Sequence, residues 1–82
     1  MALISKVELG SAGWNSVYYT DGTKYVGYTI NKEIREGLGS LYNSNGHVIQ
    51  RGVWSNNELI ETLEENEYNL QVNASMQHQH HW

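Results

Sequence analysis

The sequence contains no cysteine, no proline and no phenylalanine, and only five of its 82 residues are basic. Without cysteine the chain can form neither disulfide bonds nor thiolate metal sites, which fits a reducing compartment. No apolar run approaches the roughly 20 residues of a membrane span or the roughly 7 to 15 of a signal-peptide core. We therefore expect one small cytoplasmic domain, for which self-association would add stability.

The net charge of −4 is distributed unevenly along the chain. Residues 1–54 hold all five basic residues and four acidic ones, whereas residues 55–82 hold five glutamates and no lysine or arginine. Proteins that bind nucleic-acid backbones or anionic membranes need clustered lysine and arginine. We therefore expect no direct nucleic-acid binding and no lipid binding, and a protein partner instead. The lack of a long apolar run separately predicts no membrane span.

Residues 37–54 contain the clearest structural signal, two strand-like runs joined by Asn45 and Gly46. An Asn-Gly pair between such runs is the strongest short-range signal for a β-hairpin. A weaker copy precedes it, with strands expected at residues 14–20 and 24–30 around Asp21-Gly22, a pair that suits a type I′ turn. The pattern predicts two consecutive hairpins within residues 12–54.

The flanking segments complete one predicted domain, residues 1–75. Residues 1–11 contain an imperfectly alternating strand at 3–9, and the polar residues 31–36 are interpreted as a connecting turn. Ser55 and Glu58 have the spacing of a capping box, which predicts an acidic helix over residues 55–68. Residues 69–75 alternate as a possible last strand, and residues 76–82 form a polar, histidine-rich tail. The expected fold class is mainly β, an antiparallel twisted sheet of hairpins with one C-terminal α-helix.

The two hairpins resemble the MORN repeat (membrane occupation and recognition nexus), a β-hairpin unit of roughly 23 residues. The resemblance covers residues 12–57, at most two repeats. It rests on the repeat positions Gly22, Tyr25, Gly27, Gly37, Gly39, Tyr42, Gly46, Gly52 and Trp54. The first unit departs from the pattern, because Asn15 stands where a glycine is expected and Tyr28 or Thr29 where a Trp or Phe is expected.

The resemblance implies a single-layer array in which aromatic rings lie across glycines of neighbouring strands. It implies no catalysis, because the family consists mostly of interaction and scaffold modules that often dimerise. Some members are linked to phospholipids, but the few scattered basic residues here argue against that property. A short array needs caps at its ends, which the strand at residues 3–9 and the acidic helix would supply.

Two functions remain open from the sequence. The first is a non-enzymatic, self-associating protein-interaction module that pairs through exposed strand edges. The alternative is a small acidic inhibitor, of the kind that a phage could encode, that blocks a basic nucleic-acid-binding site on a target protein. The candidate partner-binding residues are Glu58, Glu61, Glu64 and Glu65, placed on the predicted helix through which the inhibitor would act. Glu61 and Glu65 share a helical face, but a solvated face explains them better than a catalytic pair.

The remaining candidates are weaker. His78, His80 and His81 have a spacing that Zn or Ni could use, although a tail without a metal role is the simpler interpretation. The tyrosines and tryptophans could stack on nucleic-acid bases, but without a basic groove we assign them to packing between repeats. We expect no catalytic residue, no cofactor and no metal.

Overall fold

The computed structural model describes the backbone of residues 2–79 and the side chains of residues 2–75. Six strands precede one helix, with a short 3-10 turn (Ser11–Gly13) after the first strand. The elements are β1 (Ile4–Glu8), β2 (Trp14–Tyr19), β3 (Lys24–Ile30), β4 (Ile34–Tyr42), β5 (Val48–Ser55), β6 (Glu58–Thr62) and α1 (Glu65–Gln79).

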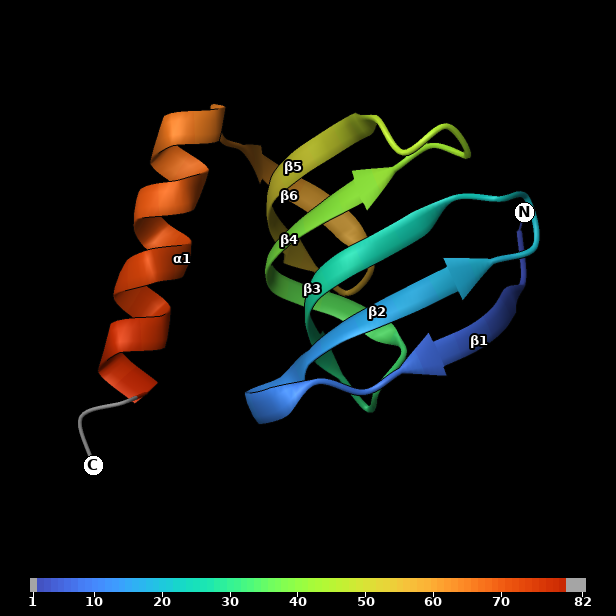
Figure 1. Ribbon diagram of the computed structural model, residues 1–82, viewed down its shortest axis with the longest axis horizontal. Coiled ribbons are helices and arrows are strands. Elements are labelled where there is room, and N and C mark those ends of the chain that lie inside the picture. The colour runs from blue at the N-terminus through green and yellow to red at the C-terminus, as the bar shows by residue number, and fades with distance from the viewer. Residues whose placement is uncertain (1, 80–82) are drawn as a thin grey trace.

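Each strand pairs antiparallel with the next one, so the sheet order follows the chain order from β1 to β6. Figure 1 shows the sheet curling strongly, with β5 and β6 behind β4 and with α1 to one side. The strand pairs all join neighbours in sequence, as expected for successive hairpins with short turns. The predicted fold class is confirmed: a mainly β, antiparallel sheet with one C-terminal helix.

The two faces of the sheet bury different groups. On one face, here named the core face, Val17, Tyr25, Leu41 and Trp54 form the buried cluster. The rings of Tyr25 and Trp54 meet edge to face, with centroids 5.5 Å apart, an arrangement that aromatic pairs favour. The opposite face, the helix face, packs against α1.

A row of three glycines crosses the core face. Gly39 of β4 lies opposite Gly27 of β3 on one side and Gly52 of β5 on the other. A Cβ atom added at Gly39 would overlap the ring and hydroxyl of Tyr25. The buried hydroxyl of Tyr25 donates to the carbonyl of Tyr28 at 2.7 Å. The expectation that an aromatic ring covers a glycine of the neighbouring strand is met at this position, because only glycine leaves room for the ring.

Asn15, where a glycine was expected, has its own structural role. Its side chain is buried, accepts from the backbone N–H of Gly10 at 3.0 Å and donates to the hydroxyl of Thr29 at 2.7 Å. A buried amide is stable only when such partners satisfy it. Asn15 therefore fixes the chain between β1 and β2 and joins it to β3.

The hairpins lie where predicted, but the first turn has a different geometry. Only Gly22 of the Asp21-Gly22 pair has a positive φ (+90°), whereas a type I′ turn requires positive φ at both central residues. The Asp21 carboxylate accepts from the backbone N–H and the hydroxyl of Thr23 at 3.0 and 2.6 Å. This Asx-type contact stabilises a turn that needs positive φ only at the glycine. The second hairpin is similar, because Gly46 (φ +86°) is the residue of the Asn45-Gly46 pair that has a positive φ.

The helix predicted over residues 55–68 is wrong. Ser55 and Glu58 face each other across a two-residue turn, in which Asn56 and Asn57 have φ of +51° and +73°. A β-turn and a capping box place their end residues at the same spacing, and two asparagines tolerate the positive φ that the turn needs. The chain therefore returns as a sixth strand, β6.

The last strand predicted at residues 69–75 is also wrong, because these residues belong to α1. Tyr68 is buried, and Val72 and Ser75 are half-buried among exposed neighbours. That spacing of four and three residues is one face of a helix. Ser75 forms a hydrogen bond with the Tyr28 hydroxyl at 2.7 Å. The backbone of residues 76–79, predicted as tail, continues α1.

The turn predicted at residues 31–36 is shorter than expected. Ile30 pairs with Ile34, so only residues 31–33 form the turn and β4 begins at Ile34. Asn31 and Lys32 reverse the chain with positive φ values of +53° and +71°. The polar residues that follow were misassigned because Arg35 is on the core face despite its charge.

Candidate functional site

The guanidinium of Arg35 lies among three aromatic rings on the core face. Its central carbon is 5.0 Å from the ring centroid of Tyr19, 5.0 Å from that of Trp54 and 5.9 Å from that of Tyr25. A guanidinium at such distances is attracted by the ring faces, and arginine stacks on them better than lysine. Because β2, β3, β4 and β5 each supply one member, the cluster exists only once the hairpins have paired.

Arg35 is held by both its side chain and its backbone. The Nε–H donates to the hydroxyl of Tyr19 at 2.9 Å. The backbone N–H donates to Oδ1 of Asn57 at 2.9 Å, and the carbonyl accepts from the N–H of Asn57 at 3.0 Å. These bonds join the start of β4 to the turn before β6 and restrict the position of the guanidinium.

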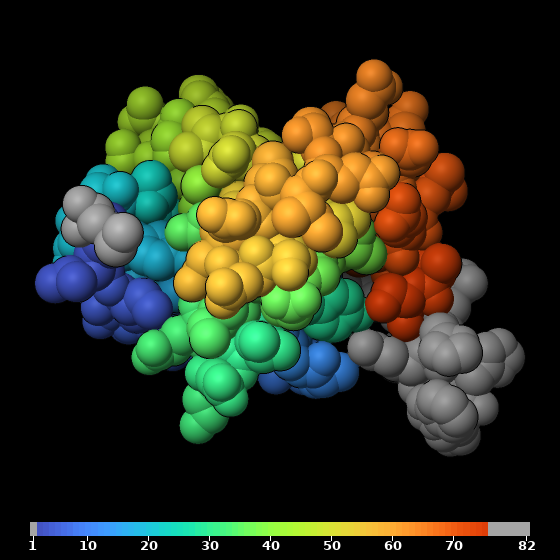
Figure 2. All heavy atoms as spheres, turned by 180° about the vertical axis from the view of Figure 1, so that it is seen from behind, coloured from blue at the N-terminus to red at the C-terminus, as the bar shows by residue number. Residues whose placement is uncertain are grey.

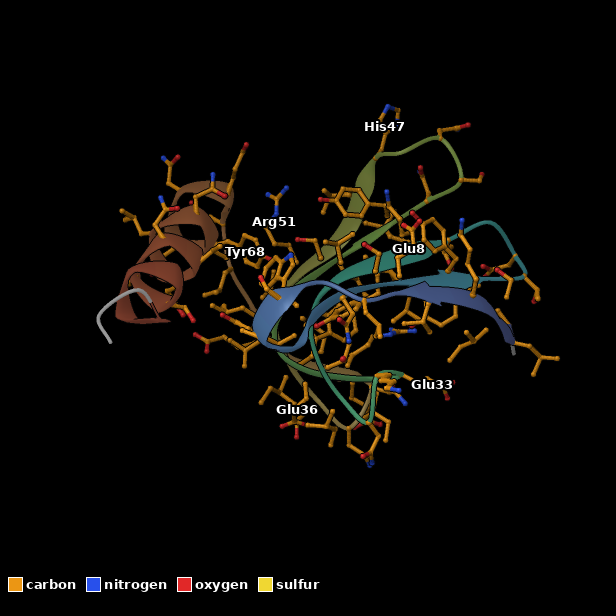
Figure 3. The ribbon with its side chains drawn as sticks, turned by 60° about the horizontal axis from the view of Figure 1, so that its bottom comes forward. Glu8, Glu33, Glu36, His47, Arg51 and Tyr68 are labelled. Carbon is orange, nitrogen blue, oxygen red and sulfur yellow. The ribbon has the colours of Figure 1, made fainter. Side chains whose placement is uncertain are left out.

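A hollow of about 340 Å³ adjoins the Arg35 side chain. It is lined by Ala2, Ile4, Tyr19, Glu33, Arg35 and Asn57. Among the described side chains, no carboxylate lies within 4.0 Å of the Arg35 guanidinium, and its terminal nitrogens make no hydrogen bond. Figure 3 shows Glu33 and Glu36 at the end of the sheet opposite His47, so the hollow opens near the turn between β3 and β4.

The helix face carries a row of lysines and tyrosines that crosses β1 to β4. The strand register places Lys6 beside Tyr18, Tyr18 beside Lys24, and Lys24 beside Tyr42. The Lys6 ammonium is 4.7 Å from the Tyr18 centroid, and that of Lys24 is 5.7 Å from Tyr18 and 5.4 Å from Tyr42. Exposed contacts of this kind contribute about 0.5–1 kcal/mol each. The row is therefore a basic and aromatic surface.

The four candidate glutamates do not lie on one helix. Glu58 and Glu61 lie on β6, Glu64 precedes α1, and Glu65 is in its first turn. Their predicted placement on one helix is corrected, because the segment folds as a strand followed by a helix. All four are exposed, and Figure 2 shows β6 and the start of α1 on the same outer surface. They line an acidic edge of the molecule.

The helix is attached to the sheet mainly through Tyr68. Its side chain is 7% exposed, and the Arg51 guanidinium lies 5.7 Å from its ring centroid. Figure 3 shows Tyr68 directed from α1 toward Arg51 of β5. Burial raises the pKa of the Tyr68 hydroxyl, and burial likewise raises that of Tyr25. Both phenols are therefore neutral well above pH 7.

The histidines contribute no site to the described structure. His47 is exposed at the tip of the second hairpin (Figure 3). The His78 backbone belongs to α1, whereas His80 and His81 lie outside the described residues. Within the part of the chain that is described, no cluster of three or more His, Asp or Glu residues is placed to hold a metal ion.

Comparisons with models of protein families, with curated proteins and with solved structures find no match to this chain. Of the helices in the described residues, none has the length and apolar character needed to cross a membrane.

The sequence indicated the rings and glycines of the core but not the arginine among them. Tyr25, Gly39 and Trp54 come together as their spacing suggested. Arg35 was placed in a polar turn, and Tyr19 was assigned only to packing, together with the other tyrosines. A charged residue on the core face breaks the alternation by which a strand is detected, so the first residues of β4, around Arg35, were assigned to the preceding turn.

Proposed function

We propose that this protein is a non-enzymatic interaction module that forms a homodimer through the open edge of β1. The observation that carries the proposal is the exposure of this edge strand. Within the part of the chain that the structure describes, β1 pairs only with β2, and of its five residues only Val7 is half-buried. Leu3 and Leu9, at its two ends, are 71% and 63% exposed. An unpaired strand edge presents free backbone donors and acceptors to a second strand.

The sequence of β1 is complementary to itself in one antiparallel register. If two copies pair about a twofold axis at Val7, Lys6 of each copy faces Glu8 of the other. Lys6 and Glu8 both lie on the helix face, beside Tyr18 and Ser16 of β2. Opposite charges directly across a strand pair stabilise it by about 0.2–1 kcal/mol, and the twofold axis doubles this contribution.

The β6 edge is less suited to pairing with its own copy. Glu58 and Glu61 are exposed along β6, and antiparallel pairing of two such strands would bring like charges close together. Charged side chains on an edge strand prevent unwanted pairing in many natural sheets. The two edges therefore support different roles, with β1 for self-association and β6 kept apart from other copies.

Charge exchange in β1 tests the proposal. Sedimentation equilibrium of the wild-type protein should give about twice the chain mass of 9.4 kDa. Lys6→Glu replaces two attractive pairs by two repulsive ones, which should raise the dimer dissociation constant roughly 30-fold. Glu8→Lys should act similarly, and the double variant Lys6→Glu/Glu8→Lys should restore the dimer.

Lys32→Glu is the matched control, because it makes the same charge change in the exposed turn between β3 and β4. Its dimer should resemble that of the wild type. A monomer at high concentration would reject self-association. A dimer that responds equally to Lys6→Glu and Lys32→Glu, with no restoration in the double variant, would reject the β1 edge.

We also propose that the chain is a short member of the MORN-repeat family. Support comes from the way the repeat positions are used, with the Tyr25 ring over Gly39 and the Trp54 indole N–H donating to the Gly39 carbonyl at 2.9 Å. The substitutions Gly39→Ala and Tyr25→Leu test this packing, because a ring that covers a glycine leaves no room for a larger side chain at that position.

The acidic edge favours a second candidate, an inhibitor that occupies a basic nucleic-acid-binding site. Glu58, Glu61, Glu64 and Glu65 are exposed, and no lysine or arginine among the described residues pairs with them within 4.0 Å. Such an unneutralised field would steer association with a basic partner. Affinity capture with the wild-type protein and with all four glutamates reversed to lysine separates the candidates. Loss of nucleic-acid-binding proteins from the captured set supports the inhibitor, and their retention contradicts it.

A further inference from the structure

The Arg35 side chain is positioned as a binding group as well as a packing group. Its Nε–H is used by Tyr19 and its faces lie against aromatic rings, which fixes the plane of the guanidinium. The terminal nitrogens carry four further N–H donors, and none of these has a hydrogen-bond acceptor among the described side chains. A preorganised guanidinium loses less conformational entropy on binding than a free one.

The adjoining hollow indicates what this fork would bind. A carboxylate matches the two parallel N–H groups of a guanidinium in a bidentate pair. Ala2 and Ile4 supply an apolar wall, whereas Glu33 lines the same hollow. The nearby Glu33 charge disfavours a doubly charged phosphate more than a singly charged carboxylate. The volume of about 340 Å³ accommodates a small aliphatic group attached to that carboxylate.

We propose that Arg35 anchors a binding site for a monocarboxylate with a short aliphatic body. The carboxylate accepts from the terminal nitrogens of Arg35, and the aliphatic part lies against Ile4. A free small acid and the C-terminal residue of a peptide share this chemistry. The site lies on the core face, so it goes beyond self-association through β1 and does not depend on it.

The test is an NMR titration of the wild-type protein with sodium butyrate, at constant ionic strength maintained with sodium chloride. The Arg35 Nε–H and the ring protons of Trp54 should shift and saturate, with a dissociation constant on the order of 10 mM. A peptide ending in valine with a free carboxylate should shift the same signals, and its C-terminal amide should not. If butyrate saturates the shifts and the peptide does not bind, the ligand is a small free acid. If the peptide binds more tightly than butyrate, the ligand is the C-terminus of a chain.

Arg35→Lys is the decisive variant, because it keeps the charge and the aliphatic stem while it removes the planar fork. Butyrate binding, measured through the Trp54 ring signals, should weaken about tenfold. Lys24→Gln is the control, since it removes a cation that lies between two tyrosine rings on the opposite face, and it should bind butyrate as the wild type does. Absence of saturable shifts in the wild type, or equal affinity in Arg35→Lys, would overturn the proposal.

Discussion

Replacing Gly39 by alanine tests the packing that organises the core face. The added Cβ would overlap the ring and hydroxyl of Tyr25, whose side chain is fully buried. The ring cannot move away freely, because the Trp54 ring lies 5.5 Å away. The substitution introduces no backbone strain, because the φ of Gly39 lies outside the positive region that disfavours alanine. Its cost therefore comes from the displacement of the neighbouring side chain and not from the backbone.

Two contributions set the magnitude. Overpacking of a close-packed core costs about 1–3 kcal/mol. Displacing Tyr25 also breaks its 2.7 Å hydrogen bond to the Tyr28 carbonyl, and an unsatisfied buried group costs about 1–3 kcal/mol. We expect a loss of about 3 kcal/mol in the free energy of unfolding. That is a large share of the roughly 4–12 kcal/mol expected for a domain of this size.

The assay is equilibrium unfolding in urea, followed by tryptophan fluorescence. A loss of about 3 kcal/mol should lower the midpoint by roughly 2–3 M at a slope of about 1–1.5 kcal/mol per M. Gly46→Ala is the matched control, because Gly46 has φ +86° and nothing within 4 Å of an added Cβ. It should cost only the backbone strain, about 1–2 kcal/mol.

A second variant measures the contact itself. Tyr25→Leu shortens the side chain that overlaps the added Cβ, so Gly39→Ala should cost at least about 1 kcal/mol less in that background than in the wild type. The reasoning is refuted if Gly39→Ala costs no more than Gly46→Ala, or if the two changes at Gly39 and Tyr25 are additive.

Two further predictions concern pH and the helix. Burial raises the pKa of Tyr25 and Tyr68 above the ordinary value of 10.0, so their stabilising contribution is complete below pH 10 and is lost as the pH rises above it. Urea unfolding between pH 8 and 11 should show the free energy of unfolding falling by up to about 1.4 kcal/mol per pH unit for each tyrosine. Tyr25→Phe should reduce this slope. An unchanged slope would contradict the role of the buried Tyr25 hydroxyl. Tyr68→Ala should detach α1, because a 15-residue helix is marginal alone, and should reduce helical circular dichroism while Trp54 fluorescence is retained. Leu70→Ala, at a side chain 69% exposed on the same helix, is the control, and retention of the helix in Tyr68→Ala would count against the proposed attachment.

Several elements could be predicted because their signals are local. Asn45 and Gly46 mark a hairpin, and the strand at residues 24–30 was placed at its observed bounds. The segment after Trp54 could not be assigned in the same way. Ser55 and Glu58 have one spacing that serves both a β-turn and a helix cap, and only a neighbouring strand decides between them. Here β5 offers a free edge, so residues 58–62 pair with it.

The candidate site shows the same division. The packing of rings on glycines could be predicted from the sequence, because a ring over a glycine follows from strand register and side-chain size. The position of Arg35 could not be predicted, because its surroundings come from four strands that are distant along the chain. By itself the sequence determined the repeated hairpins and the uneven distribution of charge. The tertiary structure decided which charges are exposed on an edge and which one is held among rings, since that depends on the register and curvature of the assembled sheet.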